Sequence, residues 1–349
     1  MLSTRVRKGR CCQVRKPTIK DVAARSGMSI GTVSRVLNGS QATSEASRLA
    51  VLEAARELGY LPNAHARSLR SAHSGTIALL VPDIRNPFFA ELARVVESAA
   101  LDHGLATLLC NADEDAAQFD RYVEVIRRQR VDGVAMIPLG EAHQAIDRVI
   151  ADAIPMVFLD RHVPDIAVPS VVSDPEPGLS QAVDRLLEAG HTRIGFITGP
   201  MASSTGRERF HAYRSAMAAR GIDVDPELVA HGDFQEESGM QGSALLLDRG
   251  VTAILASDSL MSMGALRTCH ARGLRIGQDI DLIGFDDLPV FTLTDPPLTV
   301  VDQPIAEIGR HGVEMLLARM AGEQADSVRL PTRLIDRSST RKDAGSPAR

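Results

Sequence analysis

The stretch TIKDVAARSGMSIGTVSRVLNGS, Thr18 to Ser40, contains two short helical patterns separated by a glycine. Thr18 followed by Asp21 predicts a capping box for the first helix, and Gly27 supplies the turn after it. Ser29 is a good N-cap for the second helix, whose apolar residues recur at the i, i+3, i+4 spacing of a buried stripe. Two helices joined by a short glycine-containing turn predict a helix-turn-helix unit.

A third, supporting helix is expected over residues 44–58. Asn38 and Gly39 are expected to end the second helix. The predicted inner faces of the three helices are Val22 and Ala23, then Val33, Val36 and Leu37, then Leu49, Leu52, Ala55 and Leu58.

The outer face of the second helix carries three small residues, Gly31, Thr32 and Ser34. Ile30 and Arg35 lie on the same face. A helix that enters the major groove presents its N-terminal turns to base edges, and small residues there allow close approach. An arginine can make a bidentate contact to guanine. The pattern therefore favours DNA binding over an ordinary solvated helix face.

The charge of the chain is divided unevenly along its length. Residues 1–73 hold 10 Arg and 3 Lys against 1 Asp and 3 Glu, a net charge of +9, while the whole chain has a net charge of −5. The rest of the chain therefore carries −14. The basic N-terminal part, which we call the head, is therefore expected to bind a polyanion. The acidic remainder, which we call the body, is not.

The same stretch, with RLAVLEAARELGYLPNAHARSLRS further along, resembles the LacI/GalR family of bacterial transcriptional repressors. The resemblance extends from Thr18 to about Arg337. It implies that the second helix reads the major groove and that Ile30, Gly31 and Arg35 vary with operator choice, with Arg35 doing most of the direct base reading. It also implies phosphate or base contacts at Thr18, Ser29, Thr32, Ser34 and Asn38.

The segment NAHARSLRSAHSG, which follows Pro62, is short, basic and weakly apolar, and by itself it is typical of a linker. The resemblance implies that it folds into a hinge helix on DNA. Leu69 then matches a wedge between base pairs in the minor groove, with Arg70 beside it, and apolar wedges of this kind bend the duplex. The alternative is that Leu69 packs on the body.

From Gly75 onward, short apolar runs alternate with helical patterns, which predicts parallel sheets with helices on both faces. Residues 75–337 are too many for one sheet of ordinary size, so two lobes are expected. The runs expected to be strands are TIALLVPD, ATLLCNA, GVAMIP, PMVFLD, SVVSD, RIGFITG, TAILASD and DLIGFDD.

Ligands of such sheets bind beyond the carboxyl ends of the strands. Each polar residue there can also be the N-cap of the next helix, and for Asp258 the two roles are equally expected. Asn86 and Pro87 predict a helix start, and one of the two phenylalanines that follow is expected to face away from the core as a stacking plate. The polar strand ends are Asp83, Asp160, Arg161, Asp258 and Asp286.

The body resembles the effector domain of the same family and the periplasmic sugar-binding proteins, on the motifs NPFFAEL, IPMVFLDR, GRERFHAY, LASDSLMSMGALR and LIGFDD. The resemblance implies that Phe88 and Phe89 flank a sugar ring and that Phe234 matches an effector-side position of a purine-binding member. Carboxylates and planar guanidinium groups suit the paired donors and acceptors of a polyol. The residues expected to bond its hydroxyls are Arg161, Arg209, Asp258 and Asp286.

Two departures bear on the effector. MIPLGEA has Leu139 where the sugar binders have an aspartate. The purine-binding member has an arginine where Ser203 stands and an aromatic residue where Arg161 stands. A sugar is therefore expected ahead of a nucleobase, and the identity of the sugar stays open.

The motifs of common enzymes are missing from the sequence, which has no GxSxG, GxxxxGK[ST] or HExxH pattern. His191 is expected to cap or pack a helix end rather than act as a base. The four cysteines lack metal-ligand spacing, and no apolar run approaches a membrane span. We therefore expect no catalysis, no cofactor, no metal and a cytoplasmic location.

The patterns predict an α/β protein with a small all-α helix-turn-helix head and a two-lobed parallel α/β body, and the resemblance implies that this body is an effector domain of the periplasmic-binding-protein type. The expected function is a repressor that binds a palindromic double-stranded DNA operator as a homodimer and is switched by a sugar. The alternatives are a nucleobase effector, or a carbohydrate-binding body without a regulatory role. The expected divisions are a basic extension (1–17), the head (18–63), a hinge (64–74), the effector and dimerisation domain (75–337) and a flexible tail (338–349).

Overall fold

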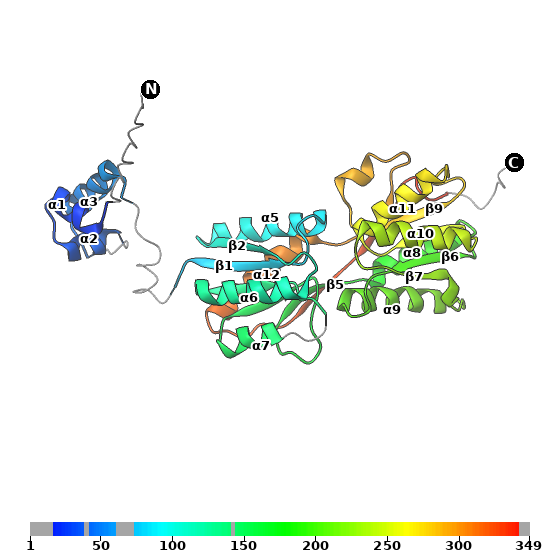
Figure 1. The fold of residues 1–349 in the computed structure, drawn as a ribbon, viewed down its shortest axis with the longest axis horizontal. Coiled ribbons are helices and arrows are strands. Elements are labelled where there is room, and N and C mark those ends of the chain that lie inside the picture. Colours follow the sequence, from blue (N-terminus) through cyan, green and yellow to red (C-terminus); the bar gives the residue numbers. More distant parts are fainter. Residues whose placement is uncertain (1–16, 38–41, 61–72, 141–143, 342–349) are drawn as a thin grey trace, which may run out of the picture. The chain divides into compact units, whose positions relative to one another are not determined.

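The computed structural model describes residues 17–37, 42–60, 73–140 and 144–341. The chain divides into two compact units, Met1–Ser74 and Gly75–Arg349. The described residues of the first unit form three helices (Figure 1), α1 (Ile19–Ser26), α2 (Ile30–Leu37) and α3 (Glu45–Leu58).

The sequence signals at the ends of α1 are confirmed. The backbone N–H and the hydroxyl of Thr18 both donate to Asp21 Oδ2 at 2.7 Å. Gly27 follows the helix in the left-handed conformation, with φ at 69°, which glycine adopts at little cost. Four of the five predicted inner residues of α1 and α2 are buried, Val22, Ala23, Val33 and Val36, and the fifth, Leu37, is half-buried against them.

The predicted buried face of α3 is wrong at two positions. Leu49 is 62% exposed and Leu52 is 45% exposed. Ala55 is buried as predicted, and Val51 and Ala54 are buried in place of the two leucines. A core built from three short helices covers only a narrow stripe of each one, and on α3 that stripe carries two small alanines in place of the larger leucines.

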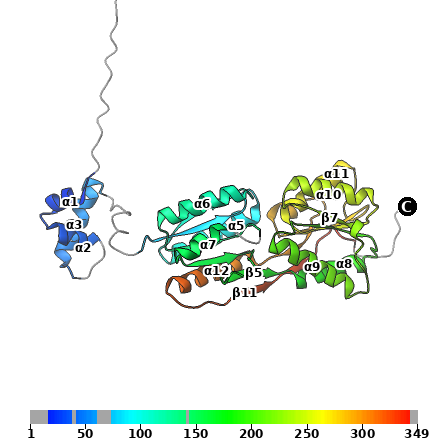
Figure 2. The same cartoon turned by 60° about the horizontal axis from the view of Figure 1, so that its bottom comes forward.

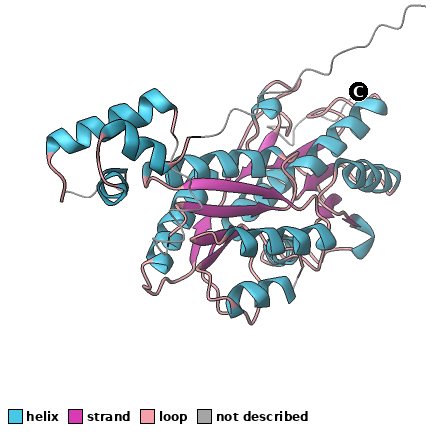
Figure 3. Cartoon of the chain, turned by 60° about the vertical axis from the view of Figure 1, so that its left-hand side comes forward, coloured by secondary structure: helices cyan, strands magenta, loops and turns pink. Residues whose placement is uncertain are grey.

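The second unit contains two six-stranded sheets, each with helices on both faces (Figures 1 and 3), as predicted. The sheet of the first lobe has the order β11-β5-β4-β3-β1-β2 and all its pairings are parallel. Its strands are β1 (Thr76–Val81), β2 (Ala106–Asn111), β3 (Gly133–Met136), β4 (Met156–Leu159), β5 (Ser170–Asp174) and β11 (Val328–Pro331).

The sheet of the second lobe has the order β12-β10-β9-β8-β6-β7, with only the edge strand β12 antiparallel to its neighbour among the described residues. Its strands are β6 (Ile194–Thr198), β7 (Val229–His231), β8 (Ala253–Ala256), β9 (Asp281–Phe285), β10 (Thr299–Asp302) and β12 (Arg333–Ile335).

Each sheet is covered on both faces by helices, so its central strands are largely apolar. In the first lobe α5 (Pro87–Asp102) and α12 (Ile305–Met320) pack on one face. The other face carries α6 (Ala116–Gln129) and α7 (Gln144–Ala151). In the second lobe the pairs are α10 (Glu236–Asp248) with α11 (Ser259–Ala271), and α8 (Glu176–Glu188) with α9 (Ser204–Ala218).

The chain crosses between the lobes three times, after β5, after β10 and between β11 and β12 (Figures 1 and 2). The three crossing segments pack together at Gly178. A Cβ atom there would lie 2.6 Å from both Thr332 Oγ1 and Val301 Cγ1. The hydroxyl of Thr332 accepts from Gly178 N and donates to Asp174 O, so it ties two crossings to each other.

All eight apolar runs expected to be strands are strands, and four further strands were not predicted, namely β7, β10, β11 and β12. Residues 338–341, placed in the tail by the sequence, are packed. Ser339 is buried and its hydroxyl donates to Leu282 O, while Arg341 bonds the buried Asp281. Within the described ranges no helix is long and apolar enough to cross a membrane.

Candidate functional site

The outer face of α2 carries the candidate DNA-reading side chains. Ser29 Oγ accepts from Thr32 N at 3.1 Å, so it caps the helix, as predicted. Ile30 is 47% exposed, and Gly31 and Arg35 are also exposed. Thr32 and Ser34 are half-buried. Three further DNA-binding candidates, Asn38, Leu69 and Arg70, lie outside the described residues, as do most of the extension and the hinge.

The seven predicted effector-binding side chains all line one pocket in the second unit. They come from both lobes and from widely separated parts of the chain. The pocket is lined by Asn86, Phe88, Phe89, Asp160, Arg161, Thr205, Arg209, Phe234, Asp258, Asp286 and Gln303. We call it the cleft. Its cavity of about 10 Å³ holds about one water molecule.

The first lobe supplies the start of α5. Asn86 caps the helix, because its Oδ1 accepts from Phe88 N at 3.0 Å. The expectation that one of the two phenylalanines faces away from the core is wrong, since Phe88 is 3% and Phe89 5% exposed. Their rings meet edge to face with centroids 5.1 Å apart. Both line the cleft and both pack in the core, because the second lobe covers this helix end. The strand-end residue Asp83 does not line the cleft; its carboxylate bonds Arg85.

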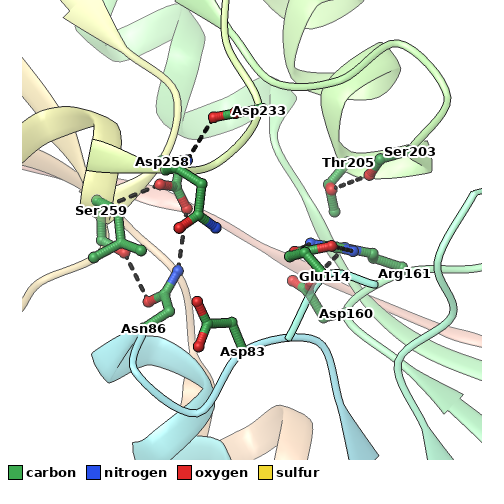
Figure 4. A network of polar contacts seen from close by, with 12 residues as sticks. Asp83, Asn86, Glu114, Asp160, Arg161, Ser203, Thr205, Asp233, Asp258 and Ser259 are labelled. Atoms are coloured by element: carbon green, nitrogen blue, oxygen red, sulfur yellow. Dashed lines mark hydrogen bonds and ion pairs between the residues drawn. The ribbon is translucent and has the colours of Figure 1, made fainter. Parts of the chain in front are cut away.

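Arg161, after β4, spans the cleft. Its guanidinium lies 5.7 Å from the ring centroid of Phe89 in its own lobe and 5.1 Å from that of Phe234 in the other. Two of its nitrogens donate to Glu114, at 2.8 and 3.3 Å (Figure 4). The residue is 4% exposed. Its charge is therefore neutralised inside the protein by a residue from the loop after β2.

The second lobe supplies Arg209, Asp258 and Asp286. Arg209, on α9, donates to Ser257 O at 2.7 Å, and its guanidinium lies 4.0 Å from the ring centroid of Phe285. Asp258 has the capping role weighed from the sequence, and its place in the cleft leaves the ligand contact as a prediction. Its Oδ1 caps α11 and its Oδ2 faces the cleft, where Asn86 Nδ2 donates to it at 3.4 Å (Figure 4).

Three residues of the cleft have a left-handed backbone, Asp160 (φ 59°), Phe234 (φ 65°) and Asp286 (φ 64°). Non-glycine residues rarely adopt this conformation, and where they do, the positions cluster at ligand sites. Asp160 and Asp286 occupy equivalent places, directly after β4 in one lobe and after β9 in the other. The turn at each strand end aims a carboxylate into the cleft from either side.

Comparisons with known proteins agree with this architecture. Residues 18–63 match the family described as bacterial regulatory proteins, lacI family, and residues 183–340 match a periplasmic binding protein-like domain. The transcriptional regulator DegA of Bacillus subtilis is 34% identical over 331 residues, which cover 93% of this chain and 98% of DegA. The repressor CytR of Escherichia coli is 36% identical over 328 residues, with coverages of 93% and 96%.

The chain belongs to the LacI family of bacterial regulatory proteins.

Solved structures of the family resemble the whole chain. The lac repressor dimer bound to operator and an anti-inducer superposes with a TM-score of 0.83 at 29% identity, covering 94% of this chain and 100% of that one. The complex of the regulator CelR with cellobiose gives 0.71 at 36% identity, with coverages of 93% and 99%. LacI-family repressors bind operator DNA, dimerise and bind small-molecule effectors, and this chain is a transcriptional repressor of that family.

The carboxylates of this LacI-family cleft resist ionisation. Burial, followed by the negative charge of Asp286, raises the pKa of Asp258 to about 7. Burial also raises the pKa of Asp160 to about 6, although Arg209 and Arg161 act against it. The pKa of Asp286 is raised for the same reason. A cleft closed this tightly favours the neutral form of its acids.

Four residues around the cleft were not predicted as effector-binding. Asn86 and Asp160 were noticed only as a cap and as a strand end. Nothing in the sequence marks Thr205 or Gln303 as a binding residue. Thr205 follows a Gly-rich loop, and Gln303 lies in a crossing segment after β10, a strand that was not predicted. Gln303 Nε2 donates to Asp286 Oδ1 at 2.6 Å. Glu114 was also missed, since its role depends on Arg161, which lies 47 residues away.

A second set of contacts joins the lobes outside the cleft. Glu208, on α9, accepts two hydrogen bonds from Arg329, on β11, at 2.8 and 2.9 Å. His162 Nδ1 lies 3.6 Å from Glu208 Oε1, and His162 N donates to Ser204 Oγ at 3.1 Å. We call the Glu208–Arg329 pair the latch. It links the second lobe to the edge strand of the first.

His191 has the packing role expected for it. Its buried ring bonds Thr252 through Nδ1 and Asp281 through Nε2, each at 2.8 Å. The adjacent residues Asp286 and Asp287 have separate partners, since Asp286 accepts from Gln303 and Asp287 pairs with Arg337. Among the described residues, no group of three or more His, Cys, Asp or Glu side chains could hold a metal ion.

Proposed function

We propose that this repressor binds a two-fold operator through α2 of each protomer, and that an uncharged polyol, a sugar, binds in the cleft and switches that binding. Thr18, Ser29, Thr32, Ser34 and Asn38 would position the head on the phosphates and bases. Arg35, with Ile30 and Gly31, would read base edges. Binding to chromosomal DNA would place the protein in the cytoplasm.

The observation that carries the effector assignment is the convergence of seven residues, chosen from separate motifs, on one cleft between two lobes. Their chemistry is that of a polyol site, with aromatic rings from both lobes and carboxylates beside guanidinium groups. Relatives with known ligands agree, since the structure of CelR contains cellobiose.

The switch follows from the position of the cleft. A ligand that contacts both lobes has a different affinity for the open and the closed arrangement, and it shifts the equilibrium by that difference. We propose that the shift reaches the operator through residues 64–74, with Leu69 as a minor-groove wedge and Arg70 beside it. A hinge that folds only on DNA suits this role, because its ordering cost makes it sensitive to the body.

The test begins with thermal unfolding of the purified protein against pentoses, hexoses, polyols and nucleobases. A ligand that binds only the folded state raises the melting temperature. The compound that does so is then titrated into a complex with operator DNA. We expect a sugar to be the active compound and to change operator affinity by about 10-fold or more. An active compound that is only a nucleobase would contradict the sugar assignment and leave the repressor assignment standing.

Arg209→Ala is the matched variant for this titration. We expect it to bind operator as the wild type does and to lose the response to the sugar, because its guanidinium lies in the cleft and far in sequence from the head. A normal response would contradict the cleft assignment. Operator binding that weakens steeply with salt would separate the repressor from a carbohydrate-binding body with an unrelated basic head.

A further inference from the structure

The charges in the cleft are unequal. Three carboxylates and two guanidinium groups line it, those of Asp160, Asp258, Asp286, Arg161 and Arg209. Both cations already have partners. Arg161 holds two hydrogen bonds to Glu114, and Arg209 donates to Ser257 O while Asp160 Oδ1 lies 4.0 Å from its Nη2.

The unsatisfied polar atoms of the cleft show which hydrogen bonds a ligand would have to supply. Among the described residues, three buried atoms that face it have no hydrogen-bond partner: Asp160 Oδ1, Gln303 Oε1 and Arg161 Nε. Two of them are acceptors and one is a donor. A buried polar atom without a hydrogen-bond partner costs free energy. A ligand that satisfies all three atoms therefore needs two donor groups and one acceptor group. Hydroxyl and N–H groups can do this, whereas the oxygens of an ionised phosphate or carboxylate only accept.

We infer that the cleft selects an uncharged, donor-rich ligand and excludes phosphorylated and carboxylated compounds, and that Glu114 is the residue that enforces this selection. The inference deepens the proposed function, on which it rests for the use of the cleft as an effector site. Glu114 does not line the cleft. It acts by neutralising Arg161, the cation that lies across it.

Removal of the charge at position 114 would leave Arg161 buried without a hydrogen-bonded carboxylate, with Asp160 at 3.9 Å and Asp258 acting on it only through its charge. A buried guanidinium without a hydrogen-bonded partner attracts an anion, and arginine suits phosphate in geometry. The raised pKa of Asp258 and Asp160 agrees with this account, because a site that already disfavours negative charge disfavours a further anion.

The experiment uses inorganic phosphate as the probe and the full-length protein without DNA or sugar. Thermal unfolding is followed for the wild type and for Glu114→Gln as sodium phosphate replaces sodium chloride at constant ionic strength. Phosphate stabilises all proteins to some extent by exclusion from their surfaces. Glu227→Gln is the control for that effect, because Glu227 also pairs with an arginine, Arg249, but is 71% exposed.

Phosphate at about 50 mM should raise the melting temperatures of the wild type and of Glu227→Gln equally. We expect it to raise the melting temperature of Glu114→Gln by about 3 °C or more beyond that. The double variant Glu114→Gln/Arg161→Met should lose that excess. Equal gains in wild type and Glu114→Gln would overturn the inference, and so would an excess that survives in the double variant. Glu114→Asn provides the same test if the glutamine variant does not fold, because Glu114 has φ at 53° and asparagine tolerates that conformation.

This result is independent of the DNA titration. A protein that excludes phosphate as expected but responds to no sugar would contradict the proposed function alone. A protein that responds to a sugar but binds phosphate without the change at Glu114 would contradict only the inference made here.

Discussion

Asp258 caps a helix with one carboxylate oxygen and faces the cleft with the other, and burial holds its pKa at about 7. This value lies above the ordinary 3.8, so the unfolded chain releases the proton first as pH rises. The folded protein therefore loses stability from about pH 4 to about pH 7, and the loss persists above pH 7.

We expect Asp258→Asn to remove this loss, because asparagine caps a helix as well as aspartate does and carries no charge. The difference in melting temperature between the variant and the wild type should increase, in favour of the variant, by on the order of 5 °C between pH 5 and pH 8. Parallel melting curves over this range would contradict the inferred ionisation.

A cleft residue could be predicted from the sequence where it follows a recognisable strand or helix cap. Asp258 and Asp286 follow apolar strands, and Phe88 follows a helix cap. Glu114 could not be predicted, because it contributes through one long-range ion pair and its own surroundings in the sequence are those of an ordinary loop. The sequence also could not show that both phenylalanines are buried, since the second lobe covers them.

Helices α10 and α11 pack closely enough that their backbones touch, and two glycines allow it. A Cβ atom at Gly264 would lie 2.2 Å from Glu236 O and 2.6 Å from Met240 N. At Gly239 it would lie 2.4 Å from Met261 O. Backbone atoms inside a helix cannot move aside as a flexible side chain can.

We expect Gly264→Ala to lower the free energy of unfolding by about 1–3 kcal/mol, as overpacking commonly does. Gly242→Ala, on α10, is the control. A Cβ atom there would meet only side chains, those of Ala230 and Ile197, at 3.2 Å or more, so its cost should be smaller. Denaturant unfolding of both variants checks the prediction, and equal losses would contradict it.

The elements that could be predicted are those with a long apolar pattern. All eight apolar runs became strands, because strands buried on both faces are apolar throughout. Strands β10, β11 and β12 were missed. They are only three or four residues long, and β11 and β12 lie at sheet edges and contain an arginine each, so none of them gives a long apolar run. The face of α3 was misjudged because the largest apolar side chains were assumed to be the buried ones.

At the scale of the whole molecule, the latch between Glu208 and Arg329 holds the lobes together outside the cleft. The pair is bidentate but partly exposed, so its contribution is at most about 1 kcal/mol. Its partners are 121 residues apart, and nothing in the sequence around either one predicts the pairing. The two-lobed architecture itself was predicted, since strand and helix alternation over so long a stretch exceeds one sheet.

We expect Glu208→Gln to raise the equilibrium population of the open cleft by up to about 5-fold, because loss of the ion pair favours separated lobes. Hydrogen exchange of peptides that contain Arg161 and Phe234 should speed up accordingly. Asp248→Asn is the control, since it breaks an exposed pair with Arg272 between two helices of the same lobe. Unchanged exchange in Glu208→Gln would show that the latch does not hold the closed form.

The threefold crossing between lobes has a consequence for synthesis on the ribosome. Strands β11 and β12 complete different sheets and are the last two strands made. At about 5–20 residues per second, roughly 15 to 55 s separate the end of α3 from the start of β12. Once β5 and β10 are made, each is the open edge of its sheet until β11 or β12 follows, and an open edge can pair with another chain. A nascent chain therefore has the helix proposed to read DNA long before both sheets around the cleft are complete.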